Sequence, residues 1–230
     1  MKKILYFAIL FFVICYSCRK GTEKTIEISY EYFPLRAGLE RVYKVTEINI
    51  DAAINKYDTS NYYLKEKICS EYIDNSGNKA WTLERYIKND TIPSWEISDL
   101  WVAQIRNNQA QQVEENLRIV KIVFPPNKFE IWNGNAFNFL EPKYFEIKSI
   151  NESIVLNGKN YTPVLTVIEE DDYSYIHKNY EVEQYAKEIG LINRTEISIL
   201  DKSTVIDITK PIELRISVGR LYYQTLISNN

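Results

Sequence analysis

The chain has few of the residues on which most cofactor and nucleotide sites depend. Its 230 residues include seven glycines, seven prolines, three cysteines and one histidine. So few glycines leave no glycine-rich loop to cradle a phosphate, and a single histidine excludes a site with several histidine ligands. The formal net charge of −3 argues against a surface that binds the phosphates of nucleic acid. We therefore expect no metal, no cofactor and no nucleic-acid partner.

Residues that favour β-strands are abundant. The chain has 31 Ile, 13 Val, 18 Tyr, 9 Phe and 4 Trp, against only 9 Ala. β-branched and aromatic side chains suit a pleated, half-buried surface, whereas alanine is the best helix former. Charged residues make up 26% and hydrophobic residues 45%, a balance that excludes a disordered chain. The composition predicts a globular, β-rich protein of one domain, or two small ones at most.

The first 17 residues have the pattern of a secretion signal. Lys2 and Lys3 precede a 12-residue apolar run from Ile4 to Cys15. At 1.5 Å per residue the run spans about 18 Å, which is short of the roughly 30 Å hydrocarbon core of a bilayer. We therefore expect a signal peptide over residues 1–17 and no membrane span after processing.

The end of this run resembles the lipobox of bacterial lipoproteins. A small residue, Ser17, stands directly before Cys18. The resemblance implies cleavage before Cys18, acylation of Cys18, and a lipidated tether over residues 18–29. Several acyl chains give a stable membrane anchor where one does not. Cys15 is a weaker alternative because Ile14 before it is not small, and an ordinary signal peptide cleaved elsewhere is the other interpretation.

The residues after Cys18 bear on its destination. Arg19 follows the cysteine, which by resemblance to lipoprotein sorting disfavours retention in the inner membrane. The stretch from Arg19 to Glu27 lacks the acidic cluster that resembles a surface-export signal. The resemblance implies an outer-membrane lipoprotein that faces the periplasm rather than the cell surface.

From residue 30 onward, apolar alternation and turn signals predict a series of strands. Gly77 lies in a loop between two such stretches and predicts a hairpin, and Asn157-Gly158 predicts a type I′ hairpin turn. Gly219-Arg220 predicts a third turn, between Ile212–Val218 and the stretch that begins at Leu221. Leu117–Phe124 is apolar on both faces apart from Arg118 and Lys121, and it predicts a central strand.

A short helix within Asn108–Val120 is an alternative for one stretch, because Val113, Leu117 and Val120 have helical spacing. The other segments give ten to twelve strands without βαβ alternation. The prediction is a mainly β fold in one domain over residues 30–230. It consists of a single antiparallel, strongly curved sheet, a half-barrel or barrel-like meander, with at most one or two short helices.

Four segments resemble a family of Bacteroidetes outer-membrane lipoproteins of unknown activity. They are Tyr32–Leu35 with Gly38 and Tyr43, Val113–Arg118, Trp132–Asn135 and Tyr185–Leu191, the last with Glu188 at a position that is usually glycine. The resemblance implies a lipid anchor and a curved half-barrel sheet like that of periplasmic lipoprotein carriers. It implies no particular activity.

Residues that could carry chemistry are few. Cys69 would be the only thiol left after lipidation, so no internal disulfide is expected, and it is either a nucleophile with His177 or a packed thiol. The packed thiol is favoured because no activating neighbour is visible. No Gly-x-Ser-x-Gly motif accompanies His177, the only imidazole base. Glu169–Asp172 and Asp74–Asn78 are either Ca²⁺ ligands or solvated turns, and turns are favoured because calcium-loop spacing is missing.

Aromatic residues are the remaining resource. They either line a sugar or lipid cleft or fill the core and cross-strand pairs; the tryptophans among them are Trp81, Trp95, Trp101 and Trp132. Trp132, beside Asn133-Gly134, is expected either to cap the core or to meet a partner.

The sequence as a whole favours a lipid-anchored cell-envelope protein that is a non-enzymatic binding or scaffold module. Its partners would be the membrane, through the lipid, and either an apolar ligand in the concave face of the sheet or an envelope protein. One alternative is a hydrolase that acts on glycans through paired carboxylates, whose spacing is spatial and not visible in sequence. The other alternative is a structural accessory of an envelope complex.

Overall fold

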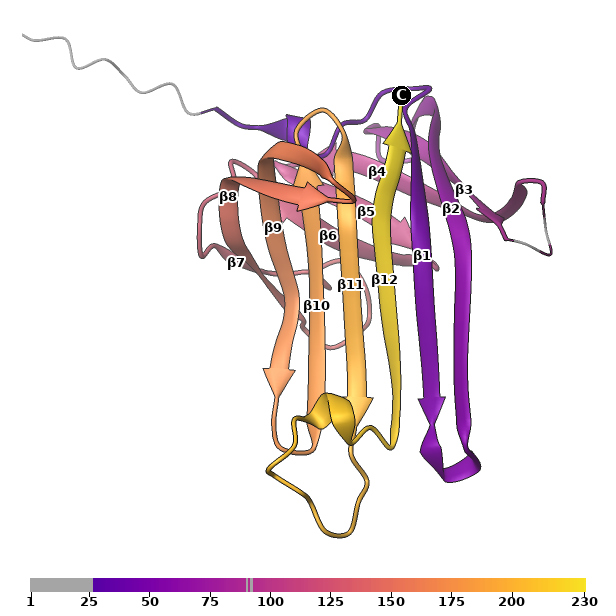
Figure 1. Ribbon diagram of the computed structural model, residues 1–230. Helices are drawn as coiled ribbons and strands as arrows, with labels where there is room; N and C mark the ends of the chain where they lie inside the picture. Colours follow the sequence, from indigo (N-terminus) through magenta and orange to yellow (C-terminus); the bar gives the residue numbers. More distant parts are fainter. Residues whose placement is uncertain (1–26, 90, 92) are drawn as a thin grey trace, which may run out of the picture.

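A computed structural model describes residues 27–89, 91 and 93–230 (Figure 1). The expected signal peptide, Cys18 and the tether up to residue 26 lie outside these residues. The described residues are mainly β, as predicted, and their only helical elements are three short 3-10 turns. None of their helices has the length and apolar character needed to cross a membrane.

Most of the strands follow one another along the chain with short connections, and the longest connection lies between β11 and β12. The strands are β1 (Glu40–Asp51), β2 (Lys56–Ile73), β3 (Lys79–Lys88), β4 (Glu96–Arg106), β5 (Gln109–Glu114), β6 (Leu117–Val123), β7 (Ile131–Asn133), β8 (Tyr144–Leu156), β9 (Lys159–Tyr173), β10 (His177–Ala186), β11 (Gly190–Leu200) and β12 (Val218–Asn229). The 3-10 turns are η1 (Tyr30–Tyr32), η2 (Ala52–Ile54) and η3 (Ile212–Leu214).

All twelve strands belong to one antiparallel sheet with the order β6-β5-β4-β3-β2-β1-β12-β11-β10-β9-β8-β7. The sheet curls until its two ends almost meet. The amide of Val120 in β6 donates to the carbonyl of Gly134 at 2.9 Å, and the indole of Trp132 donates to the carbonyl of Val120 at 2.8 Å. The predicted barrel-like meander is therefore confirmed.

The sheet has two regions (Figure 1). Where β3 and β8 take part, it forms the nearly closed upper barrel. β3 pairs with β2 only from Tyr63 onward, and β8 pairs with β9 only as far as Ile168. Beyond these points six strands continue as a sheet here called the platform: β9 from Glu170, β10 to Val182, β11 from Thr195, β12 to Tyr223, β1 from Thr46 and β2 to Tyr62.

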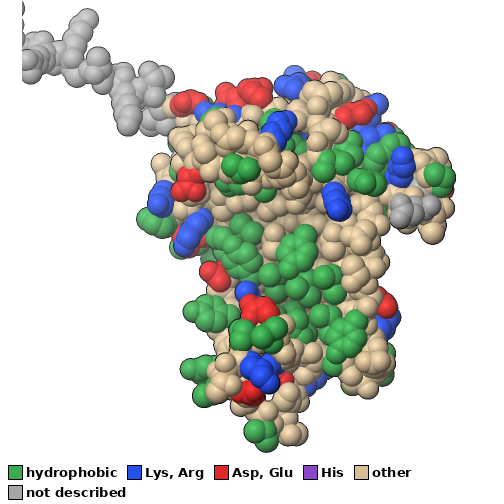
Figure 2. Space-filling model, in the orientation of Figure 1, with side chains coloured by type: hydrophobic (Ala, Val, Ile, Leu, Met, Phe, Trp, Pro, Cys, Tyr) green, Lys and Arg blue, Asp and Glu red, His purple; other side chains and the backbone are tan. Residues whose placement is uncertain are grey.

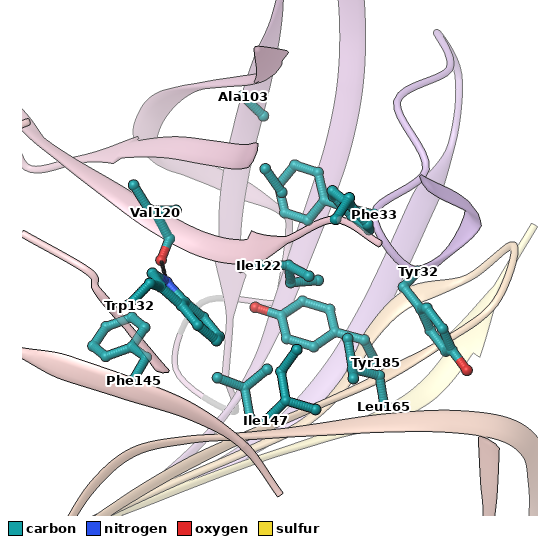
Figure 3. Packing of buried hydrophobic residues seen from close by; sticks show 13 residues of the cluster. Tyr32, Phe33, Ala103, Val120, Ile122, Trp132, Phe145, Ile147, Leu165 and Tyr185 are labelled. Carbon is teal, nitrogen blue, oxygen red and sulfur yellow. Dashed lines mark hydrogen bonds between the residues drawn. The ribbon is translucent and has the colours of Figure 1, made fainter. Parts of the chain in front are cut away.

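Large side chains fill the upper barrel (Figure 3). Tyr32 and Phe33 enter it from η1, and they meet Ile122, Ile147 and Leu165 from strands on different sides of the barrel. Four of these five side chains are fully buried, with 0% of their surface exposed, and Phe33 is 8% exposed. Close packing of this kind fixes the curvature of the sheet and leaves the barrel interior occupied by the protein itself.

Two of the predicted turns are confirmed. Gly77 has a φ of 79°, and Asn157 and Gly158 have φ values of 51° and 77°, as a type I′ turn requires. The turn predicted at Gly219 is wrong, because β12 begins at Val218 and runs straight through it. A Cβ at Gly219 would lie 2.6 Å from the carbonyl oxygen of Ser198, so this glycine permits close approach of β11.

The stretch from residue 108 to 124 also differs from expectation. The alternative of a helix is wrong, because β5 and β6 form a hairpin whose turn residues Glu115 and Asn116 have φ values of 48° and 65°. β6 is an end strand of the sheet rather than a central one. The segment around Trp132 covers its free edge and hydrogen-bonds to the backbone of Val120, as a neighbouring strand would.

Candidate functional site

The platform is apolar on its outer face. Register places Ile48, Leu221, Ile197 and Tyr180 side by side on four neighbouring strands, and all four are half-buried. Figure 2, which views this face, shows hydrophobic side chains gathered over the middle of the sheet. A patch of this kind on a soluble surface marks a site of interaction.

The inner face of the platform is charged. Arg220 lies between Glu47 and Glu196, with nitrogen–oxygen distances of 2.7 and 2.6 Å. Lys143 lies between Glu170 and Glu181, at 3.1 and 2.7 Å. The concave side of the sheet is therefore packed with side chains in the barrel and lined with ion pairs below it, and the apolar surface lies outside.

The connection from Asp201 to Ser217 folds back over the end of this outer face. η3 contacts β11, and Ile212 in η3 and Ile199 in β11 are both buried, at 8% and 2% exposed. Arg215 fastens the connection: its guanidinium pairs with Asp201 and donates to the carbonyls of Tyr175, at 2.8 Å, and Lys210, at 3.0 Å. A second clamp joins Lys178 on β10 to Glu213 at 2.7 Å.

Between this connection and the β9–β10 hairpin lies a groove of about 870 Å³, here called the loop cleft. It is lined by Asp171, Tyr173, Ser174, Tyr175, Lys178, Tyr180, Ile208, Thr209, Lys210, Pro211, Ile212, Glu213 and Arg215. Register sets Tyr180 opposite Asp171 and Tyr173 opposite Lys178 on the outer face. Three tyrosine rings and three apolar loop residues thus surround the space.

The polar groups of the loop cleft divide into two sets. Lys178 and Arg215 are held in ion pairs with the protein. Among the described residues, the carboxylate of Asp171 and the hydroxyls of the three tyrosines have no hydrogen-bond partner. Burial, helped by the charge of Asp171, raises the pKa of Tyr180, so its phenol stays neutral. The loop cleft therefore offers flat apolar walls with free hydroxyls and one free carboxylate.

His177 lies at the tip of the same hairpin and contacts a serine and an aspartate. Its Nδ1 is 2.8 Å from Ser174 Oγ, and its Nε2 is 2.9 Å from Asp172 Oδ2. The serine oxygen, however, also accepts the backbone N–H groups of Ile176 and His177, both at 3.2 Å. A hydroxyl engaged in closing its own turn is poorly placed to attack a substrate. We therefore interpret these contacts as stabilising the β9–β10 hairpin.

The most strongly perturbed titratable groups lie inside the barrel. Lys121 Nζ is 2.6 Å from Glu169, 2.8 Å from Glu183 and 3.7 Å from Glu114. Burial, with the charge of Glu169, raises the pKa of Glu183 to about 7. Burial acts to lower the pKa of Lys121, but the three glutamates raise it above its ordinary value.

This ionic cluster resembles an active site in its electrostatics but not in its access. Lys121 and Glu183 are each 2% exposed, and Arg194 and Tyr185 cover Glu183 further. Because Lys121 and Glu183 are almost fully buried and paired with each other, the cluster is interpreted as a structural one. The sequence analysis missed the cluster. Lys121, flanked by apolar residues in β6, was a signal, because a buried lysine needs acidic partners.

Two of the four tryptophans singled out in the sequence, Trp101 and Trp132, are buried in the core. Trp132 is 9% exposed and packs edge-to-face on Phe145, so of the two alternatives it caps the core. A Cβ at Gly134 would lie 2.5 Å from the ring of Phe145, which explains the glycine beside it. Trp101 is 7% exposed and lies under the guanidinium of Arg85, 3.7 Å from ring centroid to Cζ.

Cys69 is a free, partly buried thiol on β2. Burial and the neighbouring Glu84 raise its pKa, which is opposite to the activation of a nucleophile. His177 begins β10, which β1, β12 and β11 separate from β2 in the sheet, and it contacts Ser174 and Asp172. The structure does not bring Cys69 and His177 together as a pair.

The two acidic segments have different outcomes. Glu169–Asp172 does not form a loop, because all four residues belong to β9. The β9–β10 register shifts at Glu169, and the side chains of Glu169 and Glu170 pair with Lys121 and Lys143. Asp74 closes its own turn, as favoured, by accepting the amides of Ser76 and Asn78, both at 2.9 Å. In the described part of the chain, no three His, Cys, Asp or Glu side chains converge to hold a metal ion.

Comparison with known proteins adds a distant likeness in structure. No protein-family model and no curated protein matches the sequence. Two solved structures align with 86% of this chain and 98% of their own. One is named as an exported protein with a YmcC-like fold, from Bacteroides fragilis, with 12% identity and a TM-score of 0.44. The other is named as a lipoprotein, from Parabacteroides distasonis, with 14% identity and a TM-score of 0.43.

Proposed function

We propose that this protein is a lipid-anchored module of the cell envelope that binds a small amphipathic molecule in the loop cleft and performs no chemistry on it. The observation that carries the proposal is the combination of three tyrosines with polar groups that the protein itself leaves unused. Among the described residues, Glu183 is the carboxyl group whose pKa is raised to about 7, and it is 2% exposed inside the barrel, which disfavours the glycan-hydrolase alternative.

The chemistry of the loop cleft defines the class of ligand. Its volume of about 870 Å³ falls within the range of roughly 300–1,000 Å³ typical of small-molecule sites. Aromatic and aliphatic walls favour a ligand with a flat apolar face. Asp171 accepts hydrogen bonds, and the neutral phenols both donate and accept them. A ring with an apolar face and a rim of hydroxyl or amine groups satisfies both requirements.

The anchor follows from the N-terminal sequence. Cleavage before Cys18 and its acylation place the mature chain on a membrane, and Arg19 after it favours the periplasmic side of the outer membrane. Up to nine residues, 18–26, then separate the lipid from Glu27, the first described residue. An extended chain of that length spans at most about 30 Å, which keeps the domain close to the membrane.

Native mass spectrometry of protein extracted from membranes tests the binding site. We expect the wild type to carry a bound small molecule, and Tyr180→Ala to lose it because the half-buried wall of the loop cleft is gone. Tyr57→Ala is the matched control, since Tyr57 is 59% exposed on the platform outside the loop cleft. A ligand that persists in Tyr180→Ala, or that disappears equally in Tyr57→Ala, refutes the site.

Membrane fractionation with intact-mass analysis tests the anchor separately. Cys18→Ala should release the protein from membranes and remove the acyl mass. Cys15→Ala should leave both unchanged if Cys18 is the modified residue. The reverse pattern would move the lipid to Cys15, and membrane association without any acyl mass in either variant would refute the anchor.

A further inference from the structure

Strand β9 has an open edge beside the platform. β8 pairs with β9 only as far as Ile168, whereas β10 pairs with it on the other side as far as Tyr173. The Ser174 amide donates to the His177 carbonyl across the hairpin, at 2.8 Å. Antiparallel alternation then directs the backbone N–H and C=O of Asp171 and Tyr173 away from β10. No described residue pairs with them on that side (Figure 1).

A groove of about 640 Å³ runs along this open edge. One wall is β9 itself, from Glu169 to Asp172, and the other is the segment from Leu140 to Tyr144, with Asn135. The second wall carries exposed apolar side chains: Tyr144 is 67% and Leu140 44% exposed, with Phe139, at 87%, next to it in the chain. Unpaired backbone groups beside exposed apolar side chains are the elements of strand addition, in which backbone hydrogen bonds give affinity and side-chain contacts give specificity.

The charges of the groove are predominantly negative. Glu141, Glu170, Asp171 and Asp172 face it, and Lys143 is the one basic residue in its lining. Lys143 already pairs with Glu170 and Glu181, and His177 lies against Asp172. Glu169 is neutralised from the inside by Lys121. An occupant with positive charge therefore matches the groove, and an acidic one is repelled.

We propose that this groove, here called the edge groove, docks an extended, basic segment of another polypeptide, which adds to the sheet as a strand beside β9. Its backbone pairs with Asp171 and Tyr173, its lysine or arginine side chains meet the carboxylates, and its alternate apolar side chains meet Tyr144 and Leu140. The seven-residue open edge of β2, Lys56–Tyr62, provides an internal comparison. There Lys56 and Asp58 pair with each other at 3.0 Å, and the local charge is balanced.

The test uses the mature full-length protein and two synthetic octapeptides, four repeats of Lys-Val and four repeats of Glu-Val. We expect the Lys-Val peptide to bind, and to bind at least tenfold more tightly than the Glu-Val peptide. Amide hydrogen exchange should slow at Asp171 and Tyr173 and stay unchanged at Lys56–Tyr62. Glu141→Lys with Asp172→Lys should weaken binding at least tenfold. Asp58→Lys with Glu71→Lys, the same change of charge on β2, should leave it within twofold.

Several results would overturn the proposal. Equal binding of the two peptides would show that charge does not select the occupant. Absence of binding by both peptides would refute the docking site. Protection at Lys56–Tyr62 instead of Asp171 and Tyr173 would move the docking edge to β2. Binding without any amide protection would mean attraction to charge alone, with no strand added. Each result leaves the test of the loop cleft untouched, because that test scores a small molecule carried by the protein from its membrane.

Discussion

The upper barrel and the platform are built from the same strands with opposite arrangements of side chains. Along β1, Tyr43 and Val45 point into the barrel and are fully buried. Glu47, two residues further on the same face, points to the charged inner side of the platform, while Ile48 on the other face joins the apolar outer surface. The inward face thus changes from apolar to charged along one strand, where the barrel ends.

This difference separates stability from binding. In the barrel, the charges around Lys121 are buried and paired, and the interior is occupied by side chains, so a ligand there would have to displace the core. On the platform, apolar side chains lie outside, and both grooves are open to solvent. We therefore expect substitutions in the barrel to change the free energy of unfolding, and substitutions on the platform to change binding.

The largest expected effect is at Lys121. Lys121→Met leaves Glu169, Glu183 and Glu114 buried without their shared cation, so we expect a loss of about 3–5 kcal/mol in the free energy of unfolding. Arg220→Met is the platform counterpart, and since Arg220 is 43% exposed its loss should be under about 1 kcal/mol. Urea denaturation measures both, and equal losses would erase the distinction between the two regions.

The next effect is a dependence on pH from Glu183. Its pKa is about 7 in the folded protein and near 4.5 when unfolded, so the folded state holds the extra proton between these values. The contribution of Glu183 to the free energy of unfolding is therefore fully present below about pH 4.5. It falls by about 3 kcal/mol as the pH rises to about 7.

Glu183→Gln removes this titration. The free energy of unfolding of the variant, relative to wild type, should therefore increase between pH 4.5 and 7. Urea midpoints at several pH values measure it, and a constant difference between the two proteins would contradict the raised pKa.

A smaller effect is expected at the seam of the barrel, where Gly134 hydrogen-bonds to Val120 and the two ends of the sheet meet. Gly134→Ala forces the ring of Phe145 to move, since the added Cβ would lie 2.5 Å from it, and we expect a loss of about 1–3 kcal/mol. Val205→Ala, at a platform-end residue that is 84% exposed, should stay within about 0.5 kcal/mol. Thermal unfolding of the two variants measures the contrast, and an unchanged Gly134→Ala would mean that the seam is loose.

The smallest effect is expected at Cys69. The thiol is partly buried and its pKa is raised, so Cys69→Ser should cost under about 1.5 kcal/mol and leave ligand binding unchanged. Loss of the bound small molecule in a folded Cys69→Ser variant would restore the nucleophile interpretation.

Local patterns predicted the fold well. Alternation and the Asn157-Gly158 turn identify hairpins because both act between neighbouring residues. The turn predicted at Gly219 failed because its cause is a contact with Ser198 on another strand, which no local pattern contains. β6 was predicted to be a central strand because its sequence is mostly apolar. The sequence does not show whether a neighbouring strand or the Trp132 segment covers its edge.

The candidate site was harder to predict. Tyr173, Tyr175 and Tyr180 lie close in sequence, but Ile208 and Pro211 reach the loop cleft only because the connection after β11 folds back. That fold depends on Arg215, whose partners Asp201 and Tyr175 are 14 and 40 residues away in the chain. The carboxylates of β9 were visible in the sequence, but the open edge beside them follows from where β8 begins.

The division between barrel and platform is tested most directly by amide hydrogen exchange on the mature protein, before and after removal of its co-purifying small molecules. Removal should raise exchange at residues 171–180 and 208–215 and leave β6 and the barrel part of β9 unchanged. Increased exchange in β6 and that part of β9, with none around the loop cleft, would place the ligand inside the barrel and contradict this assignment.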